Sequence, residues 1–310
     1  MYLQININRI LPIIKSINFN CLILKMKLFL IQIYSRFIQI IVKLIYLLTN
    51  KGGGKFARII PPGQEYIITN YCNQFKFAVN TSFFIETAVW LSGIYEVITT
   101  RFLQQVIREG DIFLDIGANC GAITLVAASR IGKGKIYSFE PYAQVRERLE
   151  HNLALNPQLN SIVTVIPLGI SLEKKQLFYQ GDPNYKGNGS LNIYSGIAIE
   201  TTNLDNWFKQ EKINKVDVIK IDVEGMEYEV LLASKEVLRI YHPIIYFETL
   251  APFFKEKSYS IADIYTFLQD LDYEIINPQP PYHRIPLEGP YPPNSVAIYV
   301  DKKERLNSTS

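Results

Sequence analysis

Short apolar runs alternate with amphipathic segments along most of the chain after residue 110. Apolar runs of about four to eight residues between turn residues are typical of buried strands, and apolar side chains at every third or fourth position are typical of helices. The strands predicted from this pattern are 112–116, 135–139, 162–166, 216–221 and 244–247. The helices predicted between and after them are 120–131, 142–155, 226–238 and 261–271. Strands that alternate with helices in this way favour a parallel sheet covered by helices on both faces.

The segments that flank this alternation have patterns of their own. A lead region of short Tyr, Phe, Ile and Val runs at 65–100 overlaps a helical segment at 95–108. Near the other end, apolar runs at 273–276 and 295–300 predict a hairpin-like pair that ends the sheet. A loop that holds seven prolines joins these two runs.

The first 50 residues form a basic, apolar arm that predicts an amphipathic helix. Lysines and an arginine interrupt the apolar run at 21–48, so no uncharged stretch of about 20 residues is available to span a bilayer. On a helical wheel the polar side chains fall in one narrow sector: Lys25, Gln32, Arg36, Gln39, Lys43 and Asn50. Such a helix can lie on an anionic membrane surface, here through residues 22–48, or can pack on the body or on a partner.

Glycines and prolines divide the chain into four parts. Residues 1–50 are the arm, 51–64 a Gly/Pro linker, 65–110 a lead region packed on the main domain, and 111–310 that domain. No small-residue cleavage site follows the apolar run, which disfavours a cleaved signal peptide. Met26 offers an alternative start of the chain.

The net charge of +3 conceals two unlike parts. The chain has 310 residues, of which 48% are hydrophobic, and this content excludes disorder as its dominant state. Nine Lys and Arg and no acid lie in residues 1–64, which leaves 23 basic against 29 acidic residues, a net charge of −6, in the remainder. An acidic body disfavours nucleic acid as the substrate, although the basic arm could supply contacts to it.

Cysteine and histidine are too few and too scattered for a metal site. The three cysteines show no CxxC spacing and the three histidines no HxxxH spacing. The sequence therefore predicts no metal and a reducing compartment, which indicates a cytoplasmic protein that can be peripheral to the inner face of a membrane.

The end of the first strand carries candidate chemistry, in the sequence Asp115-Ile-Gly117-Ala-Asn119-Cys-Gly121. Ligands of such sheets bind beyond the carboxyl ends of the strands, where glycines let the backbone turn sharply and a helix begins. The glycine spacing differs from GxGxxG, and Asp115 would repel a pyrophosphate, which disfavours an NAD-dependent oxidoreductase. An acid at this position suits a ligand with a positive amino group.

The second strand ends at Glu140, which lies 19 residues after Gly121. An acid about 20 residues beyond the glycines is placed to accept hydrogen bonds from ribose hydroxyls. A solvated strand end or a helix cap before Pro141 is the alternative for Glu140 alone. Taken with the glycine turn, Glu140 predicts a pocket for a cationic nucleoside.

Three sequence elements together resemble the FkbM family of S-adenosylmethionine-dependent methyltransferases. They are DIGANCG at 115–121, FEP at 139–141 and VIKIDVEGMEYEVL at 218–231. The resemblance implies a class I methyltransferase fold, with seven strands and a reversed last strand, and O-methylation of a sugar, glycan, glycolipid or other hydroxyl-bearing acceptor. It also implies that S-adenosylmethionine is held by Asp115, Gly117, Asn119, Gly121 and Glu140, with Gly169 near the adenine.

Three acids at later strand ends are candidates for a catalytic base. Asp222 and Glu224 follow the fourth strand, and Glu248 closes the fifth. Two close carboxylates can separate their pKa values, which leaves one as a base near neutral pH. The alternative is that Asp222 orients the cofactor and Glu224 caps the next helix.

A tyrosine- and glycine-rich segment at 179–194 suits a carbohydrate acceptor, because tyrosine rings stack on sugar faces. Surface turns are the other interpretation of this segment, and the proline-rich loop at 278–293 could close the opposite side. Two further functions stay open: a non-enzymatic nucleoside-binding regulatory module, and a methyltransferase that acts on nucleic acid or another small molecule.

Overall fold

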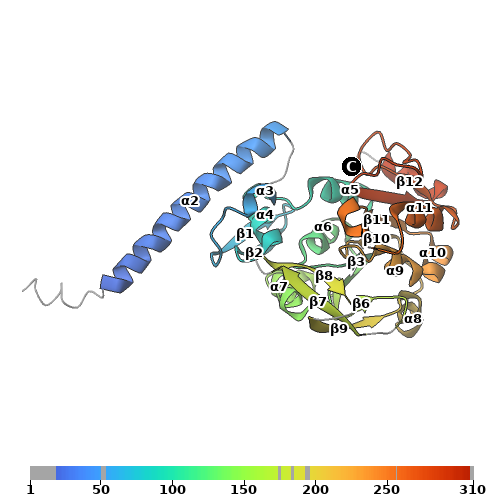
Figure 1. Cartoon of the computed structure of the whole chain (residues 1–310), viewed down its shortest axis with the longest axis horizontal. Helices are drawn as coiled ribbons and strands as arrows, with labels where there is room; N and C mark the ends of the chain where they lie inside the picture. Colours follow the sequence, from blue (N-terminus) through green and yellow to red (C-terminus); the bar gives the residue numbers. More distant parts are fainter. Residues whose placement is uncertain are drawn as a thin grey trace, which may run out of the picture.

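The computed structural model of the chain describes residues 19–49, 54–173, 176–182, 185–192, 196–255 and 257–307. A seven-stranded sheet in the order β12-β13-β11-β10-β3-β4-β5 forms its centre (Figure 1). These strands are β3 (Ile112–Ile116), β4 (Lys135–Phe139), β5 (Val163–Ile166), β10 (Val218–Ile221), β11 (Ile244–Glu248), β12 (Glu274–Ile276) and β13 (Asn294–Ile298). Neighbours from β5 to β11 are parallel, whereas β13 is antiparallel to β11 and to β12. The predicted sheet with a reversed last strand is confirmed.

Helices cover both faces of this sheet because its central strands are apolar on both sides. Successive side chains of a strand point to opposite faces, so Phe113 and Ile244 join one buried cluster while Leu114 and Ile245 join the other. The helices on the first face are α5 (Val97–Val106), α6 (Ala122–Ile131) and α7 (Ala143–Ala154). Those on the second face are α8 (Leu204–Gln210), α9 (Glu227–Leu232), α10 (Lys235–Tyr241) and α11 (Ile261–Gln269).

The single helix predicted at 226–238 is wrong, because the chain forms two helices there, α9 and α10. The carboxylate of Asp205 at the start of α8 accepts hydrogen bonds from the N–H groups of Glu236 and Val237, at 3.1 and 2.9 Å. These groups belong to the first turn of α10, so a side chain from another helix satisfies them. This break therefore depends on a tertiary contact.

A second sheet, which the apolar pattern did not predict, has the order β6-β9-β7-β8. Its strands are β6 (Gly169–Ile170), β7 (Gln176–Asp182), β8 (Tyr185–Asn192) and β9 (Ile197–Thr202). Most of the segment at 179–194 is thus an antiparallel hairpin rather than a run of surface turns. Residues 183–184 and 193–195, including Tyr194, lie outside the described residues, as do the side chains of Tyr179 and Tyr185.

The lead region shares its core with the central sheet. It consists of the hairpin of β1 (Glu65–Tyr71) and β2 (Phe75–Asn80), α4 (Phe84–Ser92) and α5, and the short helix α3 (Gly54–Ala57) precedes it. Phe77 and Trp90 belong to the same buried cluster as Phe113 of the sheet. Ala57 and Ile60, from the segment predicted as a linker, are buried in that cluster too, so residues 54–64 pack on the body instead of forming a flexible connection.

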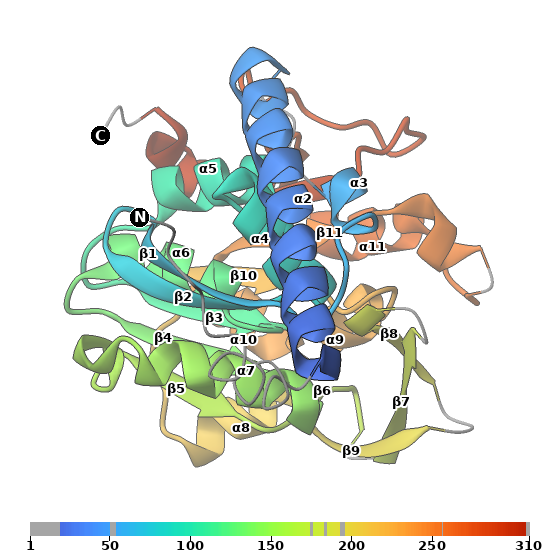
Figure 2. The ribbon, with the colours of Figure 1, turned by 90° about the vertical axis from the view of Figure 1, so that its left-hand side faces the viewer.

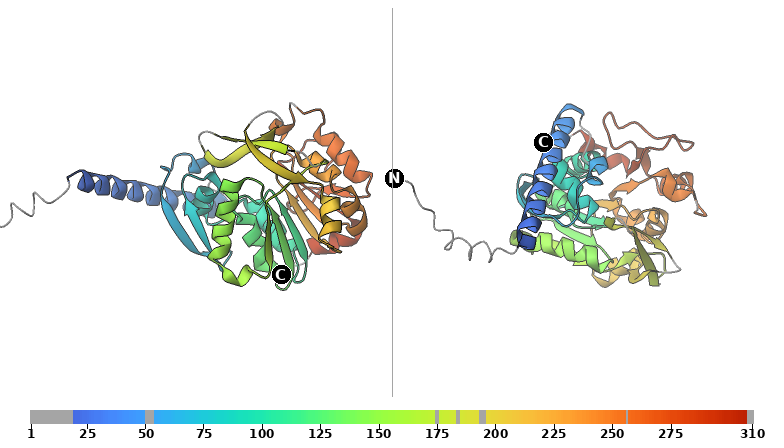
Figure 3. Two further views of the ribbon diagram at one scale, coloured as in Figure 1. Left: turned by 90° about the horizontal axis from the view of Figure 1, so that it is seen from below. Right: turned by 60° about the vertical axis from the view of Figure 1, so that its left-hand side comes forward.

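One helix of 31 residues, α2 (Phe19–Thr49), accounts for the described part of the arm. It packs on α4, which it crosses in Figure 2, and its first half projects beyond the rest of the described chain in Figure 1. The view from below shows the same projection (Figure 3). Across the described residues, no helix combines the length and the apolar character needed to cross a bilayer.

The membrane interpretation of the arm places the polar side chains of α2 on its outward face, but not all of them face solvent. The amide of Gln39 donates to the carbonyl oxygen of Trp90 at 2.7 Å, and Gln39 is only 8% exposed. The guanidinium of Arg36 lies over the rings of Tyr66 and Trp90, 5.3 and 5.6 Å from their centroids. Polar side chains of α2 therefore attach it to the body, whereas the side chains of Lys25 and Asn50 lie outside the described ones.

Candidate active site

A cavity of about 310 Å³ opens at the carboxyl ends of β3, β4, β10 and β11. This is the edge where the sequence predicted a ligand, and the volume falls within the range of small-molecule pockets, roughly 300–1,000 Å³. Its wall combines the glycine turn after β3, the segments after β4 and β10, the end of β11, and residues of the lead region. Five segments that are distant in sequence therefore build one site.

The glycine turn is possible only because Gly117 has no side chain. Its φ is +80°, and a Cβ atom there would lie 1.9 Å from the backbone oxygen of Asp222. The end of β3 thus passes so close to the end of β10 that an L side chain would collide with backbone. Gly117 and Asn119 both line the cavity, as the resemblance implied.

Lys220 of β10 occupies the centre of the site, beneath this turn. Its ammonium group lies 3.4 Å from Oδ1 of Asp115 and 3.3 Å from Oδ2 of Asp222, and it donates to the carbonyl oxygen of Gly117 at 2.9 Å. Burial acts to lower the pKa of Lys220, but the charges of Asp222, Asp115 and Glu96 outweigh it, so the pKa is raised and Lys220 stays protonated.

Asp115 differs from its predicted role. It is fully buried and does not line the cavity. The hydroxyl of Thr124 donates to its Oδ2 at 2.7 Å, and Lys220 offsets its charge. The prediction that Asp115 faces a positive group of the ligand is therefore wrong, because its cationic partner is a side chain of the protein itself.

Glu140 lines the cavity as predicted, and the backbone fixes its carboxylate. Its two oxygens accept the N–H groups of Asn119 and Tyr142, both at 2.9 Å. Burial raises the pKa of Glu140 to about 7, although these hydrogen bonds and the charges of Lys220 and Arg146 act in the opposite direction. A carboxylate oxygen offers more than one acceptor site, so Glu140 can still receive hydroxyl donors from a ligand.

Two of the predicted cofactor-binding glycines lie away from the cavity. A Cβ atom on Gly121 would lie 2.4 Å from Cδ1 of Leu149, so this glycine allows α7 to pack closely. Gly169 belongs to β6 and pairs with Thr201 of β9 in the second sheet. Neither residue lines the cavity, and the predicted adenine contact at Gly169 is wrong.

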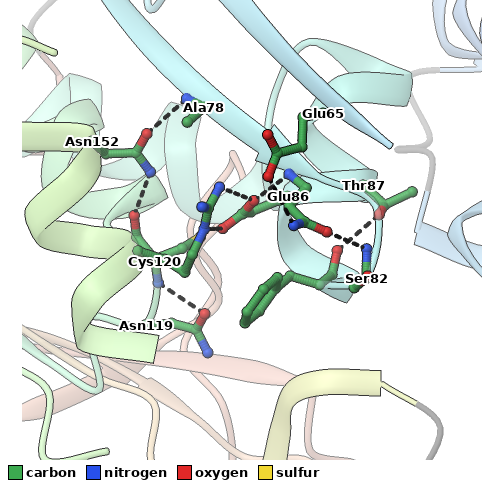
Figure 4. A network of polar contacts seen from close by, with 11 residues as sticks. Glu65, Ala78, Ser82, Glu86, Thr87, Asn119, Cys120 and Asn152 are labelled. Carbon is green, nitrogen blue, oxygen red and sulfur yellow. Dashed lines mark hydrogen bonds and ion pairs between the residues drawn. The ribbon is translucent and has the colours of Figure 1, made fainter. Parts of the chain in front are cut away.

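A buried polar network attaches the lead region to the glycine turn (Figure 4). The side chain of Asn152 accepts the N–H of Ala78 at 2.7 Å and donates to the carbonyl oxygen of Cys120 at 2.8 Å. Nearby, the fully buried Glu86 of α4 pairs with Arg148 of α7 at 2.6 Å. These contacts hold β2 and α4 against the loop that lines the cavity.

The three predicted catalytic acids, Asp222, Glu224 and Glu248, all line the cavity. Burial raises the pKa of Glu248 to about 9, and the charges of Asp222, Glu227, Glu96 and Glu224 add to this effect. Its Oε2 is buried and has no hydrogen-bond partner within the described ranges. Glu248 therefore holds a proton at neutral pH.

Glu227, rather than Glu224, binds the turn before α9. Its Oε1 accepts the N–H groups of Val223 and Gly225, at 3.1 and 3.2 Å. Glu224 has a φ of +53°, an uncommon conformation for a residue with a side chain, and it faces the cavity. Glu227 therefore makes the contacts to this turn that the alternative role predicted for Glu224.

Glu96 and Tyr95, which sequence reasoning missed, also line the cavity. Glu96 precedes the first residue of α5 and has left-handed backbone, with φ 39° and ψ 78°. Burial and the charge of Asp222 raise the pKa of Glu96 to about 7, against the opposing effect of Lys220. Lys220 was missed as well, although a lysine within an otherwise apolar strand was a signal that a buried acid is near.

No cluster of three or more His, Cys, Asp or Glu side chains in the described ranges is arranged to hold a metal ion.

Residues 115–275, just over half of the chain, match the sequence model of the methyltransferase FkbM domain. The chain belongs to the FkbM methyltransferase family. The strand order and the reversed β13 are those of the class I methyltransferase fold that the family resemblance implied.

Several curated methyltransferases are similar to this FkbM chain. Hexuronic acid methyltransferase AglP of Haloferax volcanii is 29% identical over 152 residues, which cover 48% of this chain and 59% of AglP. Methyltransferase sdnD of Sordaria araneosa is 24% identical, over 50% of this chain and 73% of sdnD. The 2-O-methyltransferase NoeI of Sinorhizobium fredii is 23% identical, over 44% of this chain and 63% of NoeI. The matched region thus spans about three-fifths of AglP and of NoeI.

Solved structures of methyltransferases are more distant. Methyltransferase FkbM from Methylobacillus flagellatus gives a TM-score of 0.41 at 14% identity, over 69% of this chain and 52% of that one. A SAM-dependent O-methyltransferase from Thermotoga maritima gives 0.40 at 14% identity, over 80% of this chain and 97% of that one. Glu96 lies outside the span of the FkbM domain match.

We predict that Gly117→Ala lowers the free energy of unfolding by about 3 kcal/mol or more, because it combines a left-handed conformation with a backbone collision. Gly110→Ala is the matched control, since Gly110 has a φ of +84° and open space around a Cβ atom. It should cost about 1 kcal/mol. Urea unfolding of both variants measures the difference, and equal losses would contradict the close approach of β3 and β10.

Proposed function

We propose that this FkbM methyltransferase transfers a methyl group from S-adenosylmethionine to a hydroxyl group of a sugar, free or within a glycan or glycolipid. The observation that carries the proposal is the cavity at the strand ends, which joins the glycine turn and Glu140 to four further acids. Acids in a partly closed cavity favour a ligand with positive charge, and a sulfonium cofactor has one.

The residues around the cavity fit this cofactor. Glu140 would receive the ribose hydroxyls, and the turn from Gly117 to Cys120 brings backbone close to the bound ligand. The cofactor, when bound, supplies an electrophilic methyl group. The protein then has to align an acceptor oxygen with that methyl group and exclude water.

Support for a sugar acceptor comes from two of the relatives, one named for hexuronic acid and one for 2-O-methylation.

The proline-rich loop at 278–293 supports it in this chain. The N–H of Thr249, directly after Glu248, donates to the carbonyl oxygen of Pro293 at 2.7 Å. The loop therefore ends beside the acids of the cavity, where it can close over an acceptor.

The three acids predicted as catalytic, Asp222, Glu224 and Glu248, would then have different roles. A protonated Glu248 can donate a hydrogen bond to the acceptor, whereas it cannot accept a proton at neutral pH. Asp222 is paired with Lys220, and Glu224 faces the same cavity. We infer that Asp222 or Glu224 accepts the hydroxyl proton.

We predict that Asp222→Asn and Glu224→Gln each lower methyl transfer, and that loss of the base lowers it by about 10²- to 10⁴-fold. At least one of the two should keep wild-type affinity for S-adenosylhomocysteine. Glu248→Gln should stay active at pH 7, because Gln imitates the protonated acid. Wild-type activity should fall as the pH rises through about 9, and this fall should be absent in Glu248→Gln.

These rates are measured with radiolabelled S-adenosylmethionine and a hexuronic acid glycan. Unchanged turnover in both Asp222→Asn and Glu224→Gln would remove the carboxylate base. Cofactor binding without transfer to any hydroxyl would favour the regulatory module, and transfer to RNA or DNA would favour the nucleic-acid alternative.

We further propose that α2 places the enzyme on an anionic membrane surface. Large apolar side chains form an exposed stripe along the helix: Met26, Phe29, Leu30, Ile33, Tyr34, Phe37, Ile40 and Leu44. The opposite face, with Ser35, Gln39 and Val42, is buried against the body. An interfacial helix needs this arrangement, with its apolar face toward lipid and the rest of the protein on the aqueous side.

Charge favours a membrane over a second copy of the chain as the occupant of this stripe. Residues 1–64 contain nine basic and no acidic side chains, so two arms would repel each other while anionic lipid would attract each one. Lys27 and Lys43 are exposed on the same helix. At 1.5 Å per residue, α2 extends about 46 Å along the surface.

We predict that the full chain sediments with vesicles that contain phosphatidylglycerol and less with vesicles of phosphatidylcholine alone. Replacing Phe29, Phe37 and Ile40 by Ser should weaken binding more than about tenfold, because each buried apolar side chain contributes about 1.5–3 kcal/mol. The matched control replaces Ile67 and Ile240, which are exposed elsewhere, by Ser. Equal binding of the two variants to vesicles would contradict the proposal. A dimer of the chain that does not bind vesicles would contradict it too.

A further inference from the structure

The burial of Asp115 leaves one part of the proposed cofactor without an acidic partner. S-Adenosylmethionine carries an ammonium group on its methionine portion, and the sequence suggested Asp115 as the acid that faces it. Lys220 neutralises Asp115 beneath the cavity floor, where a ligand does not reach it. Another acid has to take this role if the proposed function holds.

Given the proposed function, we propose that Glu96 pairs with the ammonium group of the cofactor. Glu96 comes from the lead region, and it lines the same cavity as the glycine turn and Glu140. It forms no ion pair with a side chain in the described ranges, unlike Asp115 and Asp222, which share Lys220. A cationic ligand would provide the partner that the protein does not.

A chain of hydroxyl groups holds the Glu96 carboxylate as an acceptor. The hydroxyl of Thr99 donates to its Oε2 at 2.8 Å and lies 2.7 Å from the hydroxyl of Tyr246. Because Thr99 has one proton and gives it to Glu96, the hydroxyl of Tyr246 donates to Thr99. Tyr95 also acts to lower the pKa of Glu96. These donors favour the ionised form of the carboxylate.

The backbone at Glu96 supports a role in binding. Its left-handed conformation is unfavourable by roughly 1–2 kcal/mol for a residue with a Cβ atom, and its side chain makes no capping hydrogen bond to α5. Such strain persists where the surrounding structure requires it, and it is concentrated at functional sites. Here the conformation coincides with a carboxylate that lines the cavity.

Charges from every neighbouring element act on Glu96. Asp222 and Lys220 come from the end of β10, and Glu248 and Tyr246 come from β11. In the free protein, burial and then Asp222 keep the pKa of Glu96 near 7. An ammonium group beside Glu96 favours its ionised form, so binding should release a proton and affinity should rise with pH through 7.

Calorimetry of the full chain with two ligands tests this pairing without an acceptor. S-Adenosylhomocysteine keeps the ammonium group, whereas 5′-methylthioadenosine lacks the whole amino-acid portion. We expect Glu96→Gln to weaken the binding of S-adenosylhomocysteine by about 10- to 100-fold. Its affinity for 5′-methylthioadenosine should stay within about twofold of the wild-type value. The control Glu147→Gln, at an exposed site on α7, should change neither affinity.

Three outcomes distinguish the proposed role of Glu96 from the proposed function of the protein. Glu140 has a pKa of about 7 too, so the comparison is between slopes: if affinity for S-adenosylhomocysteine rises from pH 6 to pH 8 more steeply in the wild type than in Glu96→Gln, the pairing is supported. Equal weakening of both ligands, or no effect on either, overturns the pairing while the proposed function stands. If neither ligand binds the wild type, the proposed function fails, and the role of Glu96 fails with it.

Discussion

The buried ammonium group of Lys220 is the contact on which the candidate site depends. It joins the end of β3 to the end of β10, because it pairs with Asp115 and Asp222 and donates to the carbonyl oxygen of Gly117. Without it, the carboxylate of Asp115 would be buried with no cation beside it. The tight turn at Gly117, the position of Asp222 in the cavity and the burial of Asp115 all follow from this one cation.

Several segments of the chain contribute residues to the site, and each contributes something different. The FkbM domain match covers the glycine turn, Glu140 and the acids after β10 and β11. The lead region lies before that match and contributes Glu96, held by contacts from α5 and β11. In front of it, α2 uses polar side chains to attach to the body and turns apolar ones away from it. We thus propose that catalysis, recognition of the cofactor charge and membrane location belong to separate parts of one chain.

The sequence predicted those features that depend on local pattern. The bounds predicted for β3 and β4 agree with the structure. Glu140, Asp222, Glu224 and Glu248 reach the cavity because parallel strands end at the same edge of a sheet.

Features that depend on distant partners were not predictable. The role of Asp115 changed because Lys220 lies more than 100 residues away in a strand that reads as apolar. Glu96 carries no motif, and its place in the site depends on how the lead region packs. The break between α9 and α10 requires Asp205 of α8, and β7 and β8 contain glycines and asparagines that indicate turns.

The most direct test of this account is urea unfolding of Lys220→Met and of Lys220→Met/Asp115→Asn. The single variant leaves the buried carboxylate of Asp115 and the partly exposed carboxylate of Asp222 without their cation, and we predict a loss of about 3–5 kcal/mol in the free energy of unfolding. The double variant removes one of those charges and should recover a large part of that loss. A single variant as stable as the wild type, or a double variant with no recovery, would contradict the claim that Lys220 holds the site together.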